Sequence, residues 1–414
     1  MNETERLVAR FLKYVKIPSA SKEGVMDRFP STPEQLEIGK MLVTELKELG
    51  LGDARMSEHG YVFATLPGNL PAGKAPVIGL LAHMDTYPGV SGRNVQPMIH
   101  RNYDGKDIVL SDSQVLKISE NPDLLNFIGH DIITADGTTL LGADDKAGIA
   151  EILEAIERLK AEPARPRPTI RIGFTPDEEV GNGTAHFDLK EFGADFAYTL
   201  DGSSAEEVEN ETFCADTAIV TVTGRDVHPG YAKGKMVSAV NIVAQLIRAI
   251  PEGMKPETTE GRQGYLHPTG IEGSVSQAKC TLIIRDFEVS GLKKAEELLS
   301  GLADVLMQKN PGAKIEIEIK ESYRNMKYDL AKRPEIVDVA LAAVERAGKK
   351  AKLTSIRGGT DGSRLSAMGL LTPNICGGGK NFHSKQEWIP VSVLEACTQV
   401  TTQLVWLWGS KYRD

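Results

Sequence analysis

The sequence VIGLLAHMDT (77–86) has a histidine and an aspartate directly after a continuous apolar run. A short run of this kind predicts a strand buried on both faces, as in a largely parallel sheet. In open α/β sheets, ligands bind beyond the carboxyl ends of the strands. His83 and Asp85 therefore mark the sheet edge where a site is expected. Their spacing would let the Asp85 carboxylate accept the second ring N–H of His83 and fix its tautomer.

Two further apolar runs also end at acidic residues. TIRIGFT (169–175) precedes Glu178 and Glu179, and FAYTL (196–200) leads directly to Asp201. Helical patterns alternate with these strands at 4–16, 32–49, 146–160 and 391–408. Strands that alternate with helices predict a doubly wound α/β domain whose strand ends meet at one edge.

The pattern changes between residues 213 and 319. Strand and helix patterns follow one another there at 217–224, 237–250, 278–288, 292–308 and 314–320. This order suggests a small α+β domain of ferredoxin-like type. Long helices and buried strands return afterwards, so we expect 213–319 to be inserted into a catalytic domain formed by 1–212 and 320–414.

Composition narrows the class of protein. A chain of 414 residues with 41% hydrophobic and 25% charged residues is typical of a soluble protein of two domains. The net charge of −9 argues against a nucleic-acid partner. The charged N-terminus lacks the apolar core of a secretory signal, and no run of about 18 apolar residues predicts a membrane span. Four scattered cysteines without a CxxC pair favour free thiols in a reducing cytoplasm.

The residues at the predicted strand ends belong to a larger set that suits a metal centre. Imidazole and carboxylate ligands without thiolates are typical of zinc, manganese or cobalt in a catalytic site. The set is large enough for two ions with a carboxylate to spare, as a dinuclear hydrolase requires. Its members are His83, Asp85, Asp144, Glu178, Glu179, Asp201 and His383.

In two pairs of adjacent acidic residues, the residue pattern alone does not show which member binds metal. Glu178 and Glu179 should point in different directions, so that one binds metal while the other takes a proton from the attacking water. Asp144 and Asp145 both precede a helix, and spacing does not say which aspartate binds metal and which caps the helix.

Seven segments occur in a fixed order along the chain. They are HMDT (83–86), NVQPMIHRNYDGKDIVLS (94–111), GADDKAG (142–148), PDEEVG (176–181), HPG (228–230), IRDF (284–287) and GGTDGSRLSAMG (358–369). Together they resemble the M20 metallopeptidases, and within that family the peptidase T subgroup of tripeptide aminopeptidases. The resemblance extends from the N-terminal helix to the last helix and implies two divalent metal ions, most often zinc.

The resemblance also implies which residues bind those ions. His83 and Asp201 would bind one ion. Glu179 and His383 would bind the other, and Asp144 would bridge the two. The GGG run before His383 would let the chain bend towards the site.

The roles of the other acids follow from the same resemblance. Glu178 would be the general base, and Asp85 would orient His83. The metal-binding aspartate would be Asp144 and not Asp145, because it lies two residues before the lysine.

Several residues are candidates for binding the substrate, and each has an alternative structural role. The resemblance implies that His228 would reach a neighbouring site and stabilise the oxyanion, whereas without the resemblance a histidine before a proline is more often a loop residue. Arg285 and Arg357 would bind the peptide carboxylate or form structural salt bridges. Asn102 would hold the free amino terminus or pack a loop. The inserted domain would act as a lid and as the surface of a homodimer. The chain departs from the family at Ser203 and Ser384, where glycine is common, and these serines could reshape the pocket.

The sequence therefore predicts a cytoplasmic two-zinc aminopeptidase. It would remove the N-terminal residue of short peptides, tripeptides above all, through a metal-bridging hydroxide and a glutamate base. Within the same family the alternatives are a dipeptidase, a carboxypeptidase or an N-acyl amino acid amidohydrolase. From another class, the alternative is a metal-dependent protein that binds peptides without cleaving them.

Overall fold

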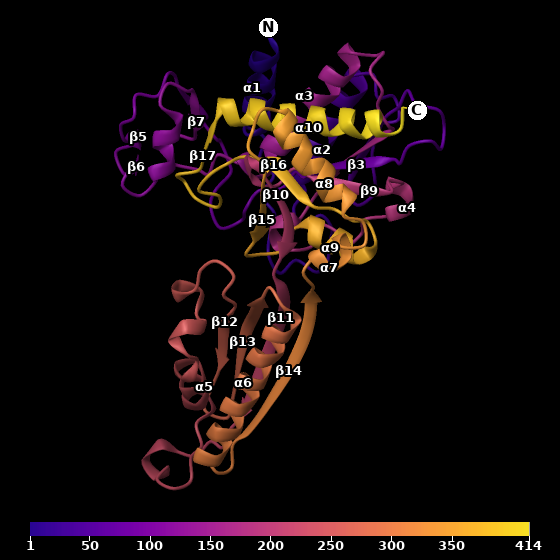
Figure 1. Cartoon of the computed structure of the whole chain (residues 1–414). Helices are drawn as coiled ribbons and strands as arrows, with labels where there is room; N and C mark the ends of the chain where they lie inside the picture. The colour runs from indigo at the N-terminus through magenta and orange to yellow at the C-terminus, as the bar shows by residue number, and fades with distance from the viewer. Residues whose placement is uncertain (414) are drawn as a thin grey trace. The chain divides into compact units, whose positions relative to one another are not determined.

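Figure 1 shows the computed structural model, which describes residues 1–413. The chain forms two compact units. The first contains Met1–Asn210, Asp329–Ser355 and the chain from Thr360 onward, and the second contains Glu211–Tyr328 with Ile356–Gly359. The segment 213–319, expected to be an insertion, lies within the second unit.

The first unit is built on an eight-stranded mixed sheet. In spatial order its strands are β1 (Arg55–Met56), β2 (Val62–Leu66), β8 (Ile170–Thr175), β3 (Ile78–His83), β9 (Phe196–Thr199), β16 (Asn374–Gly377), β10 (Ser203–Thr212) and β15 (Lys352–Ile356). The central strands β8, β3, β9 and β16 run parallel. Their carboxyl ends therefore meet at one edge, as the sequence predicted.

Helices cover this sheet. They are α1 (Glu3–Tyr14), α2 (Glu34–Glu48), α3 (Ala143–Ala161), α4 (Leu189–Phe192), α8 (Glu335–Arg346), α9 (Asp361–Met368) and α10 (Val391–Lys411). The short helix α7 (Lys327–Leu330) has residues in both units. The long helix α3 contacts β3, β16, α1 and α10. Leu80 and Leu81 of β3 point to opposite faces of the sheet, and both are fully buried. Cover on both faces confirms the doubly wound α/β class.

Smaller elements complete the first unit. A three-stranded sheet contains β17 (Trp388–Pro390), β7 (Ile132–Thr134) and β4 (Met98–His100), and a hairpin contains β5 (Ile108–Ser111) and β6 (Gln114–Leu116). Short 3-10 helices are η1 (Pro122–Phe127) and η2 (Glu178–Val180) in this unit, and η3 (Pro229–Tyr231), η4 (Glu252–Met254) and η5 (Pro256–Thr258) in the second.

The second unit has ferredoxin-like topology. Its order along the chain is β11 (Cys214–Thr223), α5 (Ala239–Ala249), β12 (Tyr265–Gly273), β13 (Gln277–Asp286), α6 (Val289–Lys309) and β14 (Lys314–Tyr323). The antiparallel sheet has the order β12-β13-β11-β14. Strand β12 was not predicted, since Pro268 and the glycines beside it resemble a loop. The strand lies at the sheet edge, where a missing N–H is tolerated.

In the part of the chain that the structure describes, residues 1–413, no helix is both long enough and apolar enough to span a bilayer.

Candidate metal centre

Three neighbouring strands deliver side chains to one edge of the sheet. His83 is the last residue of β3 and is 2% exposed. Glu178 and Glu179 open η2 shortly after β8, and Asp201 follows β9. Because these strands are parallel neighbours, residues far apart in sequence come together here.

The first group of possible metal ligands contains His83, Asp144 and Asp201. His83 Nε2 lies 2.9 Å from Asp144 Oδ1 and 3.8 Å from Asp201 Oδ1. One ligand atom from each of the three residues lies within 4.8 Å of the other two. An imidazole and two carboxylates are suitable ligands for a divalent transition metal.

The second group contains Asp144, Glu179 and His383. His383 Nε2 lies 2.8 Å from Glu179 Oε2 and 3.3 Å from Asp144 Oδ2. Asp144 therefore uses Oδ1 towards His83 and Oδ2 towards His383. A carboxylate with one oxygen in each of two ligand groups has the arrangement expected of a bridge between two ions.

The backbone separates the roles of Asp144 and Asp145. Both have non-helical dihedral angles at the start of α3, with φ −83° and ψ 104° at Asp144. The Asp145 carboxylate accepts hydrogen bonds from the backbone N–H of Gly148 at 3.2 Å and of His83 at 3.1 Å. Asp145 thus caps the helix and fixes the end of β3, while Asp144 faces the two histidines.

Glu387 holds the loop that carries Asp144, and sequence reasoning did not single it out. Its buried carboxylate accepts hydrogen bonds from the backbone N–H groups of Leu141, Gly142 and Asp144 at 2.9, 2.7 and 3.0 Å. Burial raises the pKa of Glu387 to about 7, against the opposing effect of these hydrogen bonds. No motif marks Glu387 in the sequence, because its function depends on a loop more than two hundred residues away.

Asp85 contacts His83, as predicted, and it also contacts the loop that carries Glu178 and Glu179. His83 Nδ1 lies 3.1 Å from the backbone oxygen of Asp85 and 3.4 Å from the carboxylate Oδ1. The carboxylate oxygens instead accept the backbone N–H groups of Glu178 at 3.0 Å and Glu179 at 3.1 Å. Asp85 therefore joins the end of β3 to the loop that carries both glutamates.

Glu178 differs from Glu179 in its surroundings. Glu179 belongs to the second ligand group, whereas Glu178 belongs to neither. Burial raises the pKa of Glu178 well above its usual value, and Asp201 and Asp361 add to this effect while His83 opposes it. The adjacent acids thus have different environments, as the sequence predicted for this pair.

His383 is held by its backbone and by an aromatic ring. Gly377 and Gly378 have φ of 79° and 83°, a left-handed conformation that glycine adopts without strain, and the chain bends here before His383. The Tyr87 ring stacks on the imidazole with centroids 4.1 Å apart and an interplanar angle of 3°. Tyr87 was not predicted, although its position just after HMDT placed it near the site.

The electrostatics of the centre favour bound cations. Burial raises the pKa of Asp201 well above its usual value and that of Glu179 to about 7. Burial lowers the pKa of His383, but hydrogen bonds to Asp144 and Glu179 outweigh it and raise that pKa to about 10. Glu179 Oε1 is buried without a hydrogen-bond partner. Several carboxyl groups therefore lie close together in a buried site, and one of their oxygens has no partner. Two divalent ions would supply the positive charge that this arrangement lacks.

The predicted substrate residues His228, Arg285 and Arg357 all belong to the second unit. The exposed His228 accepts the backbone N–H of Gly230 on Nδ1 at 3.1 Å, which leaves the hydrogen of a neutral ring on Nε2. Arg285 donates to the backbone oxygens of Asp216 and Ile284.

Arg357 also binds backbone carbonyls. Its guanidinium donates to Gly261 O at 2.7 Å and Gln263 O at 2.9 Å. Over residues 1–413, the hydrogen bonds of Arg285 and Arg357 go to backbone oxygens and to the Thr259 hydroxyl, and none goes to a carboxylate. Both arginines therefore connect segments within the second unit, and a role in binding a peptide carboxylate stays a prediction.

Three predicted positions in the first unit lie outside both ligand groups. Asn102 has a left-handed backbone with φ 48°, and its N–H donates to Asp131 Oδ1 at 2.9 Å. Ser203 donates to Glu207 Oε2 at 3.2 Å. Ser384, next to His383, donates to the backbone oxygen of Asn381 at 2.7 Å. The contacts of the two serines join residues three or four positions apart, and in the described part of the chain neither serine hydrogen-bonds to a residue of the two ligand groups.

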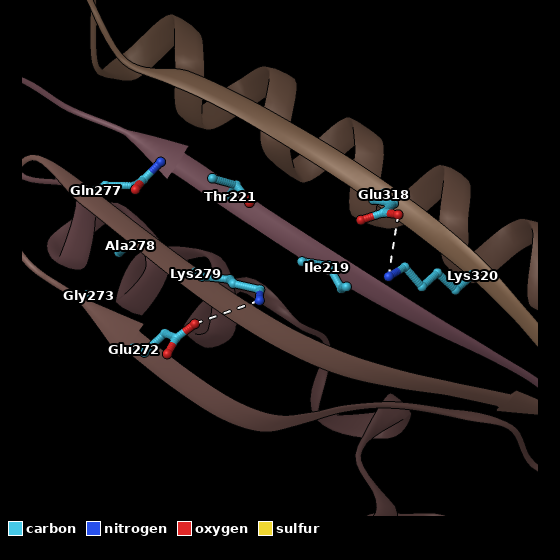
Figure 2. A pocket seen from close by; sticks show the side chains of 9 residues that line it. All are labelled: Ile219, Thr221, Glu272, Gly273, Gln277, Ala278, Lys279, Glu318 and Lys320. Atoms are coloured by element: carbon cyan, nitrogen blue, oxygen red, sulfur yellow. Dashed lines mark ion pairs between the residues drawn. The ribbon is translucent and has the colours of Figure 1, made fainter. Parts of the chain in front are cut away.

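A separate hollow lies on the second unit (Figure 2). Ile219 and Thr221 face it and alternate with the buried Val220 and Val222, so it lies on the sheet face away from the core formed with α5 and α6. Lysine–glutamate pairs line it, with Lys279 Nζ 3.7 Å from Glu272 Oε1. Its lining contains no histidine or cysteine, and we assign the candidate site to the first unit.

Comparison with known proteins gives a consistent result. Peptidase family M20/M25/M40 matches residues 125–407. The chain is 46% identical over 408 residues to a peptidase T from Halothermothrix orenii, covering 98% of this chain and 100% of that protein. It is 45% identical over 409 residues to a peptidase T from Clostridium acetobutylicum, with 98% and 100% covered.

Solved structures share the fold. An aminopeptidase PepT from Bacillus cereus has a TM-score of 0.76 and 24% identity, with 97% of this chain and 98% of that chain covered. A dinuclear metal-binding M20 peptidase from Bacillus subtilis has a TM-score of 0.66 and 14% identity, with 99% of each chain covered.

Proposed function

The chain belongs to peptidase family M20/M25/M40, and we propose that it removes the N-terminal residue of short peptides, above all tripeptides, at a two-zinc centre. It is a metallopeptidase similar over its whole length to enzymes named peptidase T. The observation that carries the proposal is the pair of ligand groups that share Asp144.

The proposed ligands divide into two sets. His83 and Asp201 hold one zinc ion, Glu179 and His383 hold the other, and Asp144 bridges them. When bound, the ions polarise the peptide carbonyl and lower the pKa of the attacking water. The open shells of nitrogen and oxygen ligands support a catalytic rather than a structural role.

Glu178 is the proposed general base. It takes the proton from the attacking water as the C–O bond forms, and then passes that proton to the nitrogen of the leaving peptide as the C–N bond breaks. Three observations support this role: Glu178 lies outside both ligand groups, it is in the field of His83 and Asp201, and its backbone is fixed by Asp85.

The charge of the site supports attack at the amino end. The acids around the two histidines are Asp85, Asp144, Glu178, Glu179, Asp201 and Asp361. When ionised, these six acids carry a charge of −6, of which two divalent ions would offset four and the neighbouring Arg364 guanidinium offsets one. The remaining negative field attracts the ammonium group of a peptide and repels its carboxylate, which favours an aminopeptidase over a carboxypeptidase.

The roles of the second unit and of the residues that would bind the substrate stay proposals. We propose that this unit is a lid and the surface of a homodimer, and that Nε2–H of His228 donates to the oxyanion. Arg285 and Arg357 are proposed for the carboxylate end of the peptide, and Asn102 for its amino end.

Four free, buried cysteines accord with the predicted cytoplasmic location.

The test compares one tripeptide in its free, N-acetylated and C-amidated forms, incubated with the zinc-loaded protein and analysed by mass spectrometry. We expect release of the first residue from the free and amidated peptides only. Cleavage of the acetylated peptide would instead indicate a deacylase, and release of the last residue a carboxypeptidase. Binding of the peptide without cleavage would contradict the assignment as an enzyme.

A further inference from the structure

A third group of ligand-type side chains lies inside the first unit and shares no residue with the metal centre. It contains Glu151 of α3, Cys376 of β16 and Cys397 of α10. One ligand atom from each lies within 4.8 Å of the other two. All three residues are at most 1% exposed. The group therefore joins two helices and a strand in the interior.

The carboxylate of Glu151 is only half satisfied. Oε2 accepts the backbone N–H of Gly377 at 3.1 Å, whereas Oε1 is buried with no hydrogen-bond partner of ordinary geometry. The Cys397 thiol, a weak donor, is hydrogen-bonded to the carboxyl group and partly offsets the effect of burial on the pKa of Glu151. A buried oxygen without a partner costs free energy that a cation would offset. Burial, together with the thiol of Cys376, raises the pKa of Glu151 well above its usual value.

The sulfur atoms complete a ligand set. Cys376 Sγ lies 3.7 Å from Thr401 Oγ1, which adds a fourth polar atom to the group. Around tetrahedral zinc, with bonds of about 2.3 Å to sulfur and about 2.1 Å to oxygen, ligand atoms are about 3.6–3.8 Å apart. The separation of 3.7 Å between Cys376 Sγ and Thr401 Oγ1 has such a value, and the upper limit of 4.8 Å for the other three residues exceeds it by about 1 Å.

We propose that Glu151, Cys376 and Cys397 form a structural site for a thiophilic divalent ion, zinc above all, with the Thr401 hydroxyl in the fourth position. A closed site with two thiolates is typical of structural zinc, in contrast to the open centre around Asp144. Binding displaces the protons of the two thiols and the carboxyl group, so affinity rises with pH. The ion would link α3, β16 and α10.

The test uses Co²⁺ as a spectroscopic probe in the full-length protein. The centre around Asp144 offers only nitrogen and oxygen ligands, so a sulfur-to-cobalt charge-transfer band in the near ultraviolet reports the thiolate site alone. We expect this band in the unsubstituted protein, with about three metal equivalents per chain. Cys397→Ser should lose the band and one equivalent and keep peptidase activity.

The matched control is Cys280→Ser. Cys280 is a buried thiol of the second unit that belongs to no ligand group, so this variant should keep the band and all metal equivalents. An active, cobalt-loaded protein without the band would overturn the proposal, and so would a band that survives in Cys397→Ser. If Cys397→Ser does not fold, X-ray absorption at the zinc edge of the unsubstituted protein decides, because the proposal requires sulfur neighbours at about 2.3 Å.

Discussion

Replacing Asp85 by asparagine tests how the loop carrying Glu178 and Glu179 is held. The two carboxylate oxygens of Asp85 accept one backbone N–H each, at 3.0 and 3.1 Å, and the residue is fully buried. Asparagine keeps the size of the side chain but offers only one acceptor. Its amide NH₂ must face either the N–H of Glu178 or that of Glu179.

The cost follows from these contacts. A hydrogen bond to a charged acceptor contributes about 1.5–3 kcal/mol, and a buried N–H left unpaired costs about 1–3 kcal/mol. We therefore expect Asp85→Asn to destabilise the native arrangement of the loop by about 2.5–6 kcal/mol. If about 3 kcal/mol of this appears in the transition state, turnover falls about 100-fold.

The assay separates the two ions. The backbone oxygen of Asp85 beside His83 Nδ1 is unchanged in Asp85→Asn, so the ion proposed to bind His83 and Asp201 should remain bound. The affinity for the ion proposed to bind Glu179 should fall, together with kcat on a tripeptide. Zinc competition with a chelator measures each affinity, and circular dichroism verifies folding.

Asp53→Asn is the matched control. The exposed Asp53 carboxylate also accepts two groups, the backbone N–H of Thr65 at 2.9 Å and its hydroxyl at 2.5 Å. Because water can replace these contacts, the control should keep metal affinity and turnover. Unchanged kcat and metal affinity in Asp85→Asn would refute the reasoning.

Three further predictions concern single side chains. Glu178→Ala should keep both ions while kcat falls about 10²–10⁴-fold, and full activity would contradict its role as base. Tyr87→Leu should weaken the ion held by His383 about tenfold in a chelator titration, whereas Tyr87→Phe should not, because the stacked ring is retained. Burial raises the pKa of Glu209 from 4.5 to about 8, so its contribution to stability is lost as pH rises through that range. The denaturation midpoint should therefore fall between pH 5 and pH 8, and it should fall less steeply in Glu209→Gln. The exposed control Glu48→Gln should keep the steepness of the unsubstituted protein, and the same steepness in Glu209→Gln would count against the raised pKa.

The strand ends explain why much of the fold and the candidate site could be predicted. A continuous apolar run such as VIGLLA has few interpretations other than a buried strand, and a histidine or acid at its end needs a partner. The structure brings His83, Asp201 and Glu179 to the edge that this pattern indicated. The choice of Asp144 over Asp145 needed the resemblance, because it depends on backbone angles that spacing does not encode.

Other features depend on contacts between distant segments. The Glu387 carboxylate accepts hydrogen bonds from a loop more than two hundred residues earlier in the chain. The Tyr87 ring stacks on the imidazole of His383, which lies near the other end of the chain. Neither partner can be identified from local sequence. Strand β12 was missed for a different reason, since Pro268 is acceptable only because the strand lies at the sheet edge.

The most direct test of the two-ion centre is a crystal of the zinc-loaded protein examined by anomalous scattering at the zinc edge. We predict two peaks about 3.5–4 Å apart beside His83 and His383, with Asp144 between them and Glu178 bound to neither. A single peak between the two histidines, or direct coordination by Glu178 in place of Glu179, would contradict the account.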